Sequence, residues 1–511
     1  MKNIQLLLLV FLPFIVFSQS TLILPSGITP ASNIPRLTNN AIKQLNSGNV
    51  GDLVFDLTFQ QLRFFNGSTW EFIVNNPSPF ATINSIKSSN NLTAPGISSD
   101  SENSIYLTGN FTDSLFLGQE TIMPLGIKNS FILKTSPDKH VIWKELIYSS
   151  EDLNTIGITI DSLDNIFVYG TFSGLLSFKS FSTNSVGGKD IFIIKLDKNG
   201  VLKFGRRFGG VSDNVISSLK VSPNKTIYFC GNFNGSMPYA GSNRVSLGGK
   251  DGFIAEMDTL GNQISFNKIG GNNDEEIKDF CFSDNYNLVV GGGFRSTISV
   301  GTSTITPNFN SFENMFLATL NYQNNSWQWA IRLNTSGNNN GIKSITQGKN
   351  GAIFVAGYYS GSFSYDSGNF SSTNPISYAA AFLLQTSSGL NINWAQNFSG
   401  IAAEIGEKVY CNSNGDVTFL LNGVSSVIYS SYLIIPNKGL GDSHLFKFSK
   451  DGNFLFHKNF SSTNEESISN TFIDKNNRTY IIGTFTNMLR LDNSIIFSLN
   501  KKQNIFWGFY D

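Results

Sequence analysis

The sequence predicts an all-β fold: a seven-bladed β-propeller with four-stranded antiparallel blades, preceded by a small α+β or β-meander module. Three observations predict it. One strand pattern recurs seven times, each complete unit holds four strand-like segments without helical periodicity, and the chain opens with an isolated fourth segment that its last unit lacks. Repeated four-stranded units of this kind are typical of propeller blades.

The recurring strand is the second segment of each unit. Its copies are IYLTGNF (105–111), IFVYGTF (166–172), IYFCGNF (227–233), LVVGGGF (288–294), IFVAGYY (353–359), VTFLLNG (417–423) and TYIIGTF (479–485). The fifth residue of each copy is glycine, except for Leu421 in the sixth, and successive copies lie about 60 residues apart. This regularity predicts one blade per copy.

The third unit shows the four segments, which we name strands a to d. They are Ile216 to Val221, Ile227 to Phe233, Gly252 to Met257 and Gln263 to Lys268. The connections between a and b, and between c and d, are short and polar. Glycine in the c-to-d turns supplies the left-handed conformation that a hairpin turn requires.

Aromatic residues mark strand d and predict how the ring closes. They recur with the period of the repeat, at Trp143, Phe204, Phe266, Trp329, Trp394 and Phe456. The seventh unit ends with strand c (Asn504 to Tyr510), whereas Phe80, one repeat length before Trp143, has no strand a, b or c in front of it. We expect the strand near Phe80 to complete the last blade, because this leaves no open sheet edge.

The residues before this strand predict two further segments. An apolar run from Ile4 to Phe17, preceded by Lys2, indicates a signal peptide over residues 1–18, too short for the roughly 20 residues that span a bilayer. Residues 19–76 form a head module and linker, with a helix from Arg36 to Leu45 and a β-meander of three strands. The propeller occupies residues 77–511.

Composition argues against a nucleic-acid partner, a membrane-spanning segment and a disulfide framework. The chain has 36 basic and 36 acidic residues without a basic stripe, which argues against nucleic acid. No later stretch is apolar for long enough to span a membrane. Three widely separated cysteines cannot build a disulfide framework, and Cys230, inside an apolar strand, is expected to be a buried packing residue.

Two stretches carry a family resemblance: GGKDIFIIKLDKNGVLKFGRRFGG (187–210) and GGKDGFIAEMDTLGNQISFNKIGG (248–271). They resemble the bacterial SBBP β-propeller repeat, whose units read GG-x-DAFVAKLD-xxG-xxW. The resemblance covers residues 78–511 and is weakest in the sixth unit. It implies a secreted or surface protein and supplies no catalytic residues.

A second resemblance covers residues 34–74. IPRLTNNAIKQL, followed by GDLVFDLTFQQLRFFNGSTWEFI, is similar to a short tail-fibre-like head module of exported Bacteroidetes proteins. It implies an origin in that lineage more than a function. Export to the periplasm, the cell surface or the medium all stay open.

The long b-to-c connections predict the binding surface. They run to about 18 residues, as in 234–250 and 295–313, and emerge on the same face as the d-to-a connections. Long loops on a rigid scaffold usually carry recognition. The strand-like sequences 115–118 and 298–301 favour the alternative that these loops form extra hairpins, and the two interpretations stay open.

Acidic residues in the d-to-a loops are the candidate binding residues: Asp152, Asp213, Asp274, Glu275 and Glu465. A ring of such acids at the channel mouth would be able to hold Ca²⁺, which takes six to eight oxygen ligands. No calcium-loop spacing occurs, so the favoured interpretation is solvated turn residues, with no cofactor and no metal site. The histidines His140, His444 and His457 lack a partner at ligand spacing, and no catalytic residue is predicted.

These observations predict an exported scaffold that binds a glycan or protein partner through its long-loop face, without catalysis. One alternative is a polysaccharide-active enzyme, a hydrolase or lyase, on the same fold, because fold does not fix function. The other is a structural stalk or adhesin component whose head module drives oligomerisation. The sequence leaves the ligand and the oligomeric state open.

Overall fold

The protein is described from a computed structural model. It describes residues 22–24, 27–29, 34–38, 41–42, 44–45, 48–57, 61–65, 67, 70–72 and 82–510, without 119, 138, 285, 309–312, 366–367, 372–377, 388, 430–432, 437–440, 461–465, 492–493 and 500–501. The predicted signal peptide and Phe80 lie outside the described residues. The chain forms two compact units, residues 1–75 and 76–511, and each is described by itself.

The first unit contains a four-stranded sheet of order β3-β4-β5-β6. Its strands are β3 (Arg36–Leu37), β4 (Leu53–Asp56), β5 (Gln61–Phe65) and β6 (Trp70–Phe72), and a separate pair joins β1 (Leu22–Leu24) to β2 (Gly27–Thr29). The predicted three-stranded meander is present, with β3 added in parallel to β4. The helix predicted from Arg36 is wrong at its start, because Arg36 and Leu37 pair with Phe55 and Asp56 as a strand.

The second unit is all-β. In the described residues, its main strands pair into successive antiparallel sets of four, each in the order a-b-c-d. The sets are β8 (Thr93–Ser99), β9 (Ile105–Phe111), β12 (Lys128–Thr135), β13 (Val141–Ser149); β14 (Leu153–Ile160), β15 (Ile166–Phe172), β18 (Asp190–Leu196), β19 (Leu202–Phe208); β20 (Asn214–Val221), β21 (Ile227–Tyr239), β22 (Ser242–Met257), β23 (Gln263–Ile269); β24 (Glu275–Ser283), β25 (Asn287–Phe294), β28 (Asn314–Asn321), β29 (Ser326–Thr335); β30 (Gly341–Gln347), β31 (Ile353–Tyr359), β34 (Ala380–Thr386), β35 (Ile392–Ser399); β36 (Glu404–Cys411), β37 (Val417–Gly423), β40 (Asp442–Phe448), β41 (Phe454–Phe460); and β42 (Glu466–Ile473), β43 (Thr479–Thr486), β46 (Gln503–Tyr510), β7 (Thr82–Ser88). A 3₁₀ turn, η2 (Lys349–Gly351), joins β30 to β31.

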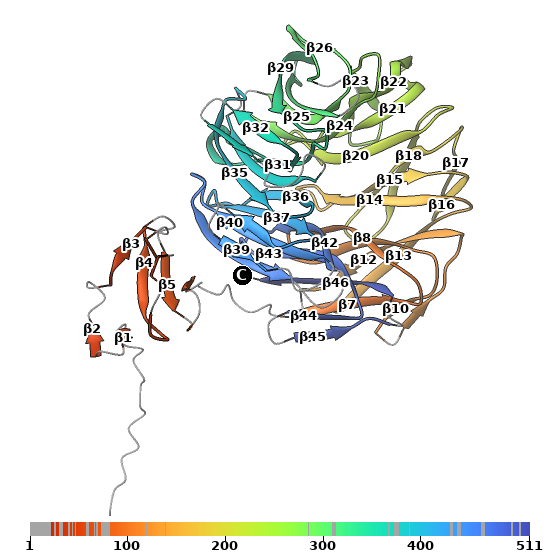
Figure 1. The fold of residues 1–511 in the computed structure, drawn as a ribbon. Helices are drawn as coiled ribbons and strands as arrows, with labels where there is room; N and C mark the ends of the chain where they lie inside the picture. Colours follow the sequence, from red (N-terminus) through yellow and green to blue (C-terminus); the bar gives the residue numbers. More distant parts are fainter. Residues whose placement is uncertain are drawn as a thin grey trace, which may run out of the picture. The chain divides into compact units, whose positions relative to one another are not determined.

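The last set joins the two ends of the unit. The early strand β7 pairs antiparallel with β46, placing Ile86 opposite Ile505 and Ser85 opposite Phe506. The predicted pairing of the strand after Phe80 with the final strand is therefore present. Figure 1 shows the sheets following one another around an axis, with β7 and β46 side by side, an arrangement of the β-propeller type.

Apolar residues between neighbouring sheets form the core. Every second residue of a strand faces one adjacent sheet, and the intervening residues face the other. Phe229 and Phe253 of the third set pack with Phe167 of the second, for example. The cluster that holds Ile86 and Trp507 of the last set also holds Leu107 of the first, so packing continues across the join.

The b-to-c connections form hairpins, as one of the two open interpretations predicted. Six are separate strand pairs: β10 (Leu115–Leu117) and β11 (Glu120–Ile122), β16 (Leu175–Phe178) and β17 (Phe181–Asn184), β26 (Ile298–Val300) and β27 (Ser303–Ile305), β32 (Ser362–Tyr365) and β33 (Gly368–Ser371), β38 (Val427–Tyr429) and β39 (Leu433–Ile435), and β44 (Met488–Leu491) and β45 (Ser494–Phe497). The remaining hairpin extends β21 and β22. Four of the hairpins add to strand d of the preceding set, β10 to β7, β16 to β13, β32 to β29 and β38 to β35. They protect the outer sheet edges.

Among the described residues, no helix is long and apolar enough to cross a bilayer. Cys230 is fully buried, as predicted, Cys281 is also buried, and all three cysteines are free thiols.

Candidate functional site

The predicted acidic residues of the d-to-a loops bond to neighbouring loops. Asp152 forms an ion pair with Lys189 (Oδ2–Nζ, 2.8 Å), which lowers the pKa of Asp152. Asp213 accepts the backbone N–H of the same Lys189 at 2.8 Å, and Asp274 accepts that of Lys250 at 3.0 Å. Asp152 and Asp213 thus lie on either side of one b-to-c loop.

Glu275 differs from the other candidates because its side chain is buried. Its carboxylate accepts the N–H of Gly271 (2.6 Å) and both the N–H (3.2 Å) and the hydroxyl (2.7 Å) of Ser296. Glu404, two units later, accepts the hydroxyl of Ser425 in the same way. Glu275 therefore closes a loop, and the remaining candidate, Glu465, lies outside the described residues. In the part of the chain that the structure describes, no group of three His, Cys, Asp or Glu residues is arranged to hold a metal ion.

The GGKD motif stabilises the b-to-c loops to which these acidic residues bond. Asp190 accepts the N–H of Val186 (3.0 Å) and pairs with Arg207 (2.6 Å), and Asp251 bonds similarly to Leu247 and Lys268. A Cβ on Gly188 would lie 2.1 Å from the Asp213 Oδ1 atom, so only glycine fits there. The residues that carry the family resemblance have a structural role.

The same loops expose aliphatic side chains at equivalent positions of three consecutive units. Leu125, Val186 and Leu247 are 61, 54 and 65 % exposed. Their backbone N–H groups donate to Asn129, Asp190 and Asp251, which hold each loop in place. We call these three side chains the apolar arc. An exposed apolar set repeated on rigid loops is a candidate contact surface.

The fourth unit differs from the first three by a pair of carboxyl groups, those of Glu276 and Glu313. Glu313 stands where the first three units have Lys128, Lys189 and Lys250. Gly293 leaves room for it, since a Cβ on Gly293 would lie 2.2 Å from the Glu313 Oε1 atom. Burial and the hydrogen-bonded neighbour Glu276 raise the pKa of Glu313 to about 7.

We expect Glu313→Gln to stabilise the protein at pH 8 and to leave its stability unchanged at pH 4.5. The folded pKa lies above the ordinary value of 4.5, so the protonated carboxyl favours folding below that value, and this contribution is lost as the pH rises through about 7. The amide cannot ionise. Melting temperatures at both pH values check this, with a rise of about 3 °C or more expected at pH 8.

The matched control for this variant is Glu120→Gln. Glu120 is exposed and pairs with Lys144 at 2.5 Å, an arrangement that contributes at most about 1 kcal/mol. If Glu313→Gln shifts the melting temperature equally at pH 4.5 and pH 8, the raised pKa of Glu313 is not the cause of the shift.

Two histidines that the sequence placed without partners lie together, which corrects that prediction. His444 of β40 and His457 of β41 approach within 3.1 Å (Nδ1 to Nε2). They are diagonal neighbours on paired strands, a relation that sequence spacing does not show. Burial lowers the pKa of His444 to about 3 and that of His457 well below its ordinary value, so both rings are neutral and suited to packing.

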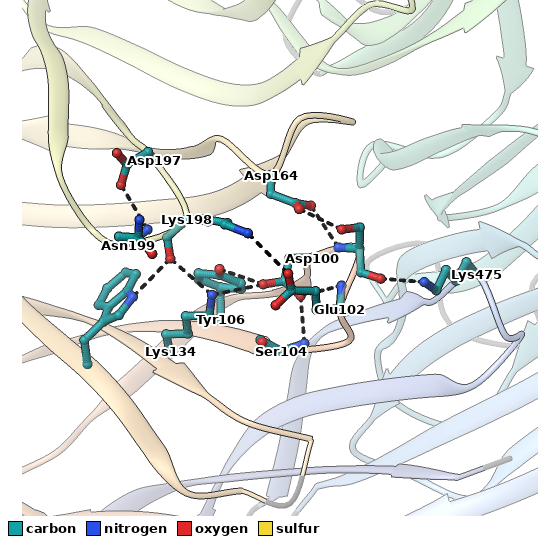
Figure 2. Close-up of polar contacts among 12 residues, drawn as sticks. Asp100, Glu102, Ser104, Tyr106, Lys134, Asp164, Asp197, Lys198, Asn199 and Lys475 are labelled. Atoms are coloured by element: carbon teal, nitrogen blue, oxygen red, sulfur yellow. Dashed lines mark hydrogen bonds and ion pairs between the residues drawn. The ribbon is translucent and has the colours of Figure 1, made fainter.

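An extended polar network lies at the a-to-b turns, near the join between the last and first sets. Asp100 accepts the hydroxyl of Tyr106 (2.9 Å) and pairs with the buried Lys134 (3.1 Å). Figure 2 shows the network reaching the second set, where Lys134 donates to the Lys198 carbonyl (3.1 Å), and the last set through Lys475. It ties together three neighbouring sets of strands.

A cavity of about 340 Å³ runs along the axis of the ring. Strand a of each of the seven sets lines it, through β8, β14, β20, β24, β30, β36 and β42. The polar lining residues include Ser98, Thr159, Tyr169, Ser218, Lys220, Asp279, Ser344, Thr346, Gln347, Lys408, Tyr410 and Asn470. The charged residues Lys220, Asp279 and Lys408 were not predicted as site residues, although charged residues in an otherwise apolar inner strand were a usable signal.

The comparisons with known proteins give no family. No family model matches the chain, and no curated protein matches its sequence. Among solved structures, a virginiamycin B lyase from Staphylococcus aureus with quinupristin is 8 % identical, with 84 % of this chain and 99 % of that chain covered and a TM-score of 0.41. The NanB sialidase from Streptococcus pneumoniae is 10 % identical (88 and 74 %, TM-score 0.34), and a DUF4221 family member from Bacteroides vulgatus is 8 % identical (84 and 98 %, TM-score 0.31).

Proposed function

We propose that the chain is an exported, seven-bladed β-propeller of the SBBP type that binds a protein partner through the face carrying its b-to-c hairpins. The observation that carries the proposal is the apolar arc. Its three side chains occupy one equivalent position in three consecutive blades and are held by bonded loops, so they are presented without the ordering cost of a flexible loop. Apolar groups surrounded by polar residues are typical of protein contacts.

The polar residues beside the arc fit the same function. Lys189, which follows Val186 in the same loop, is bonded to both Asp152 and Asp213, so charged groups lie beside an aliphatic centre. Aliphatic side chains favour a protein over a glycan, because sugars are usually bound by aromatic rings and hydrogen-bonding groups. A glycan partner is therefore the weaker of the two predicted classes.

The polysaccharide-active alternative has the carboxyl pair Glu276 and Glu313 in its favour. Glycosidases use two carboxyl groups separated by about 5 Å or more, with the sugar between them. Glu276 and Glu313 are instead hydrogen-bonded to each other, which leaves no space for a sugar. This geometry favours binding over hydrolysis.

The test compares the wild-type protein with two triple variants in quantitative capture from an envelope extract, followed by titration of the purified partner. One variant changes the apolar arc (Leu125→Ser, Val186→Ser, Leu247→Ser). The control changes three exposed aliphatic residues of the a-to-b and c-to-d turns on the opposite face (Leu163→Ser, Val201→Ser, Leu260→Ser). We expect the arc variant to lose at least about tenfold in affinity and the control to bind as the wild type does.

Equal binding by both triple variants would overturn the proposal. A glycan array and a polysaccharide-release assay run on the same proteins separate the alternatives. Arc-independent glycan binding, or sugar release that Glu313→Gln abolishes, would replace the protein-binding function.

A further inference from the structure

The axial cavity is distinct from the face proposed to bind a partner. Its lining comes from the second halves of the inner strands, for example 157–159 of β14, 218–220 of β20 and 408–410 of β36. These strand ends lead into the a-to-b turns, opposite to the b-to-c hairpins. The volume of about 340 Å³ lies within the roughly 300–1,000 Å³ of small-molecule sites.

Two of the three charged groups in the cavity satisfy each other. Lys220 pairs with Asp279 (Nζ–Oδ1, 3.0 Å) and donates to the carbonyls of Phe280 and Ile345. Asp279 also accepts the N–H groups of Phe280 and Ile345, each at 2.8 Å. All three donors of the Lys220 ammonium and both oxygens of Asp279 are therefore used within the protein.

Lys408 is the third charged group, and its charge is not matched. Among the described residues, its ammonium has neither a hydrogen bond nor an ion pair, although it lines the same cavity. Burial lowers the pKa of Lys408, while the charge of Asp279 opposes that effect. With two lysines and one aspartate, the lining has a net charge of +1. A largely enclosed cation without a partner is costly unless an anion joins it.

We propose that the axial cavity binds a small sugar acid, with its carboxylate on Lys408. Residues that carry hydroxyl groups line the same cavity, including Ser344 on the adjacent strand and Tyr410 two residues along β36. Such groups suit the hydroxyls of a sugar. The aromatic residues Phe282 and Phe472 line the same cavity and offer apolar surfaces for the C–H face of a sugar ring.

The charge and size of the cavity select this ligand class. The single unmatched ammonium of Lys408 is neutralised by one carboxylate. Inorganic phosphate carries nearly two negative charges, more than the net charge of the lining can neutralise. A neutral sugar would leave Lys408 without a partner. An acidic polysaccharide chain would have to thread a space of about 340 Å³, so a single sugar unit or a chain end fits better.

The experiment is isothermal titration of the full-length protein with D-glucuronate, with D-glucose, acetate and inorganic phosphate as separate probes. We expect glucuronate to bind at least about tenfold more tightly than glucose, acetate or phosphate. Lys408→Gln should reduce glucuronate affinity at least about tenfold. The matched control is Lys343→Gln on the adjacent inner strand, since Lys343 is paired with Glu407 (3.6 Å) and does not line the cavity.

A second variant keeps the proposal testable if Lys408→Gln folds poorly. Thr346→Val removes one lining hydroxyl without altering charge and should weaken glucuronate binding while the melting temperature stays within about 2 °C of wild type. The proposal is overturned if glucuronate does not bind at millimolar concentration, if acetate or phosphate binds as tightly, or if neither lining variant weakens binding. None of these results bears on the apolar arc, so the two proposals fail separately.

Discussion

A chain that begins at Asn90 is expected to lose its cooperative fold, whereas one that begins at Asn76 keeps it. The shorter chain lacks β7, which forms five residue pairs with β46, and it lacks Ile86 from the core cluster at the join. It also loses the hydrogen bond from the Ser88 N–H to Asn504 (2.9 Å). At about 1 kcal/mol for each lost hydrogen bond, the loss of several such bonds is comparable to the net stability of many domains, about 5–15 kcal/mol.

Circular dichroism melting and size-exclusion chromatography of the two chains check this prediction. The chain from Asn90 leaves β46 as an unpaired edge, so it should aggregate as well as melt earlier. A synthetic peptide of residues 78–90, added in trans, should restore part of the transition. Identical melting of the two chains would show that ring closure does not contribute to stability.

Lys134→Met is expected to destabilise the protein by about 3–5 kcal/mol, the usual effect of removing one partner from a buried ion pair. Lys134 and Asp100 are each 6 % exposed. Removal of the ammonium leaves the Asp100 carboxylate buried, with only Tyr106 and the turn N–H groups of Glu102 and Ser104 as partners. Urea unfolding of the wild type and the variant measures the change.

The pH dependence of this loss follows from Asp100. Burial raises its pKa, but the Ser104 N–H and the Lys134 ammonium outweigh burial, so the net pKa is lowered. The stability that this carboxylate contributes is present above its unfolded pKa and disappears as the pH falls through the folded value. The wild type and Lys134→Met should therefore converge in acid.

Two further variants complete the test of this pair. Lys198→Met removes an exposed lysine whose pairing with Glu102 (3.2 Å) should contribute less than about 1 kcal/mol. The double variant Asp100→Asn, Lys134→Met should be more stable than Lys134→Met alone, because no unpaired charge stays buried. Equal stability of Lys134→Met and Lys198→Met would contradict the buried-pair account.

The repeat was readable from the sequence because each unit repeats the same local chemistry. Glycine in strand b and an aromatic residue in strand d recur at nearly constant steps. Phe80 lies one repeat length before Trp143, the strand d aromatic of the first complete unit, and has no strand a, b or c in front of it. Strand existence and pairing order follow from such patterns. The helix predicted from Arg36 was wrong at its start because pairing with β4 outweighs local propensity there.

The candidate sites were less predictable because they depend on distances between units. His444 and His457 are brought together by strand register, and Glu313 reaches Glu276 only because Gly293 leaves room. Lys408 is notable for lacking a hydrogen-bond or ion-pair partner among the described residues, which only the assembled inner strands reveal. The acidic loop residues were visible in the sequence, but their bonds to Lys189, Lys250 and Ser296 were not.

The strand β7 is held on both sides by segments made at very different times. Its partner β10 follows it closely along the chain, whereas β46 is the last strand of the propeller to be synthesised. During synthesis, β7 therefore lacks its partner β46 until all the other sets of strands have been made. Such distant pairings make folding slow. The propeller stays incomplete until β46 has left the ribosome, and a translation product that stops before this strand has no way to finish its final sheet.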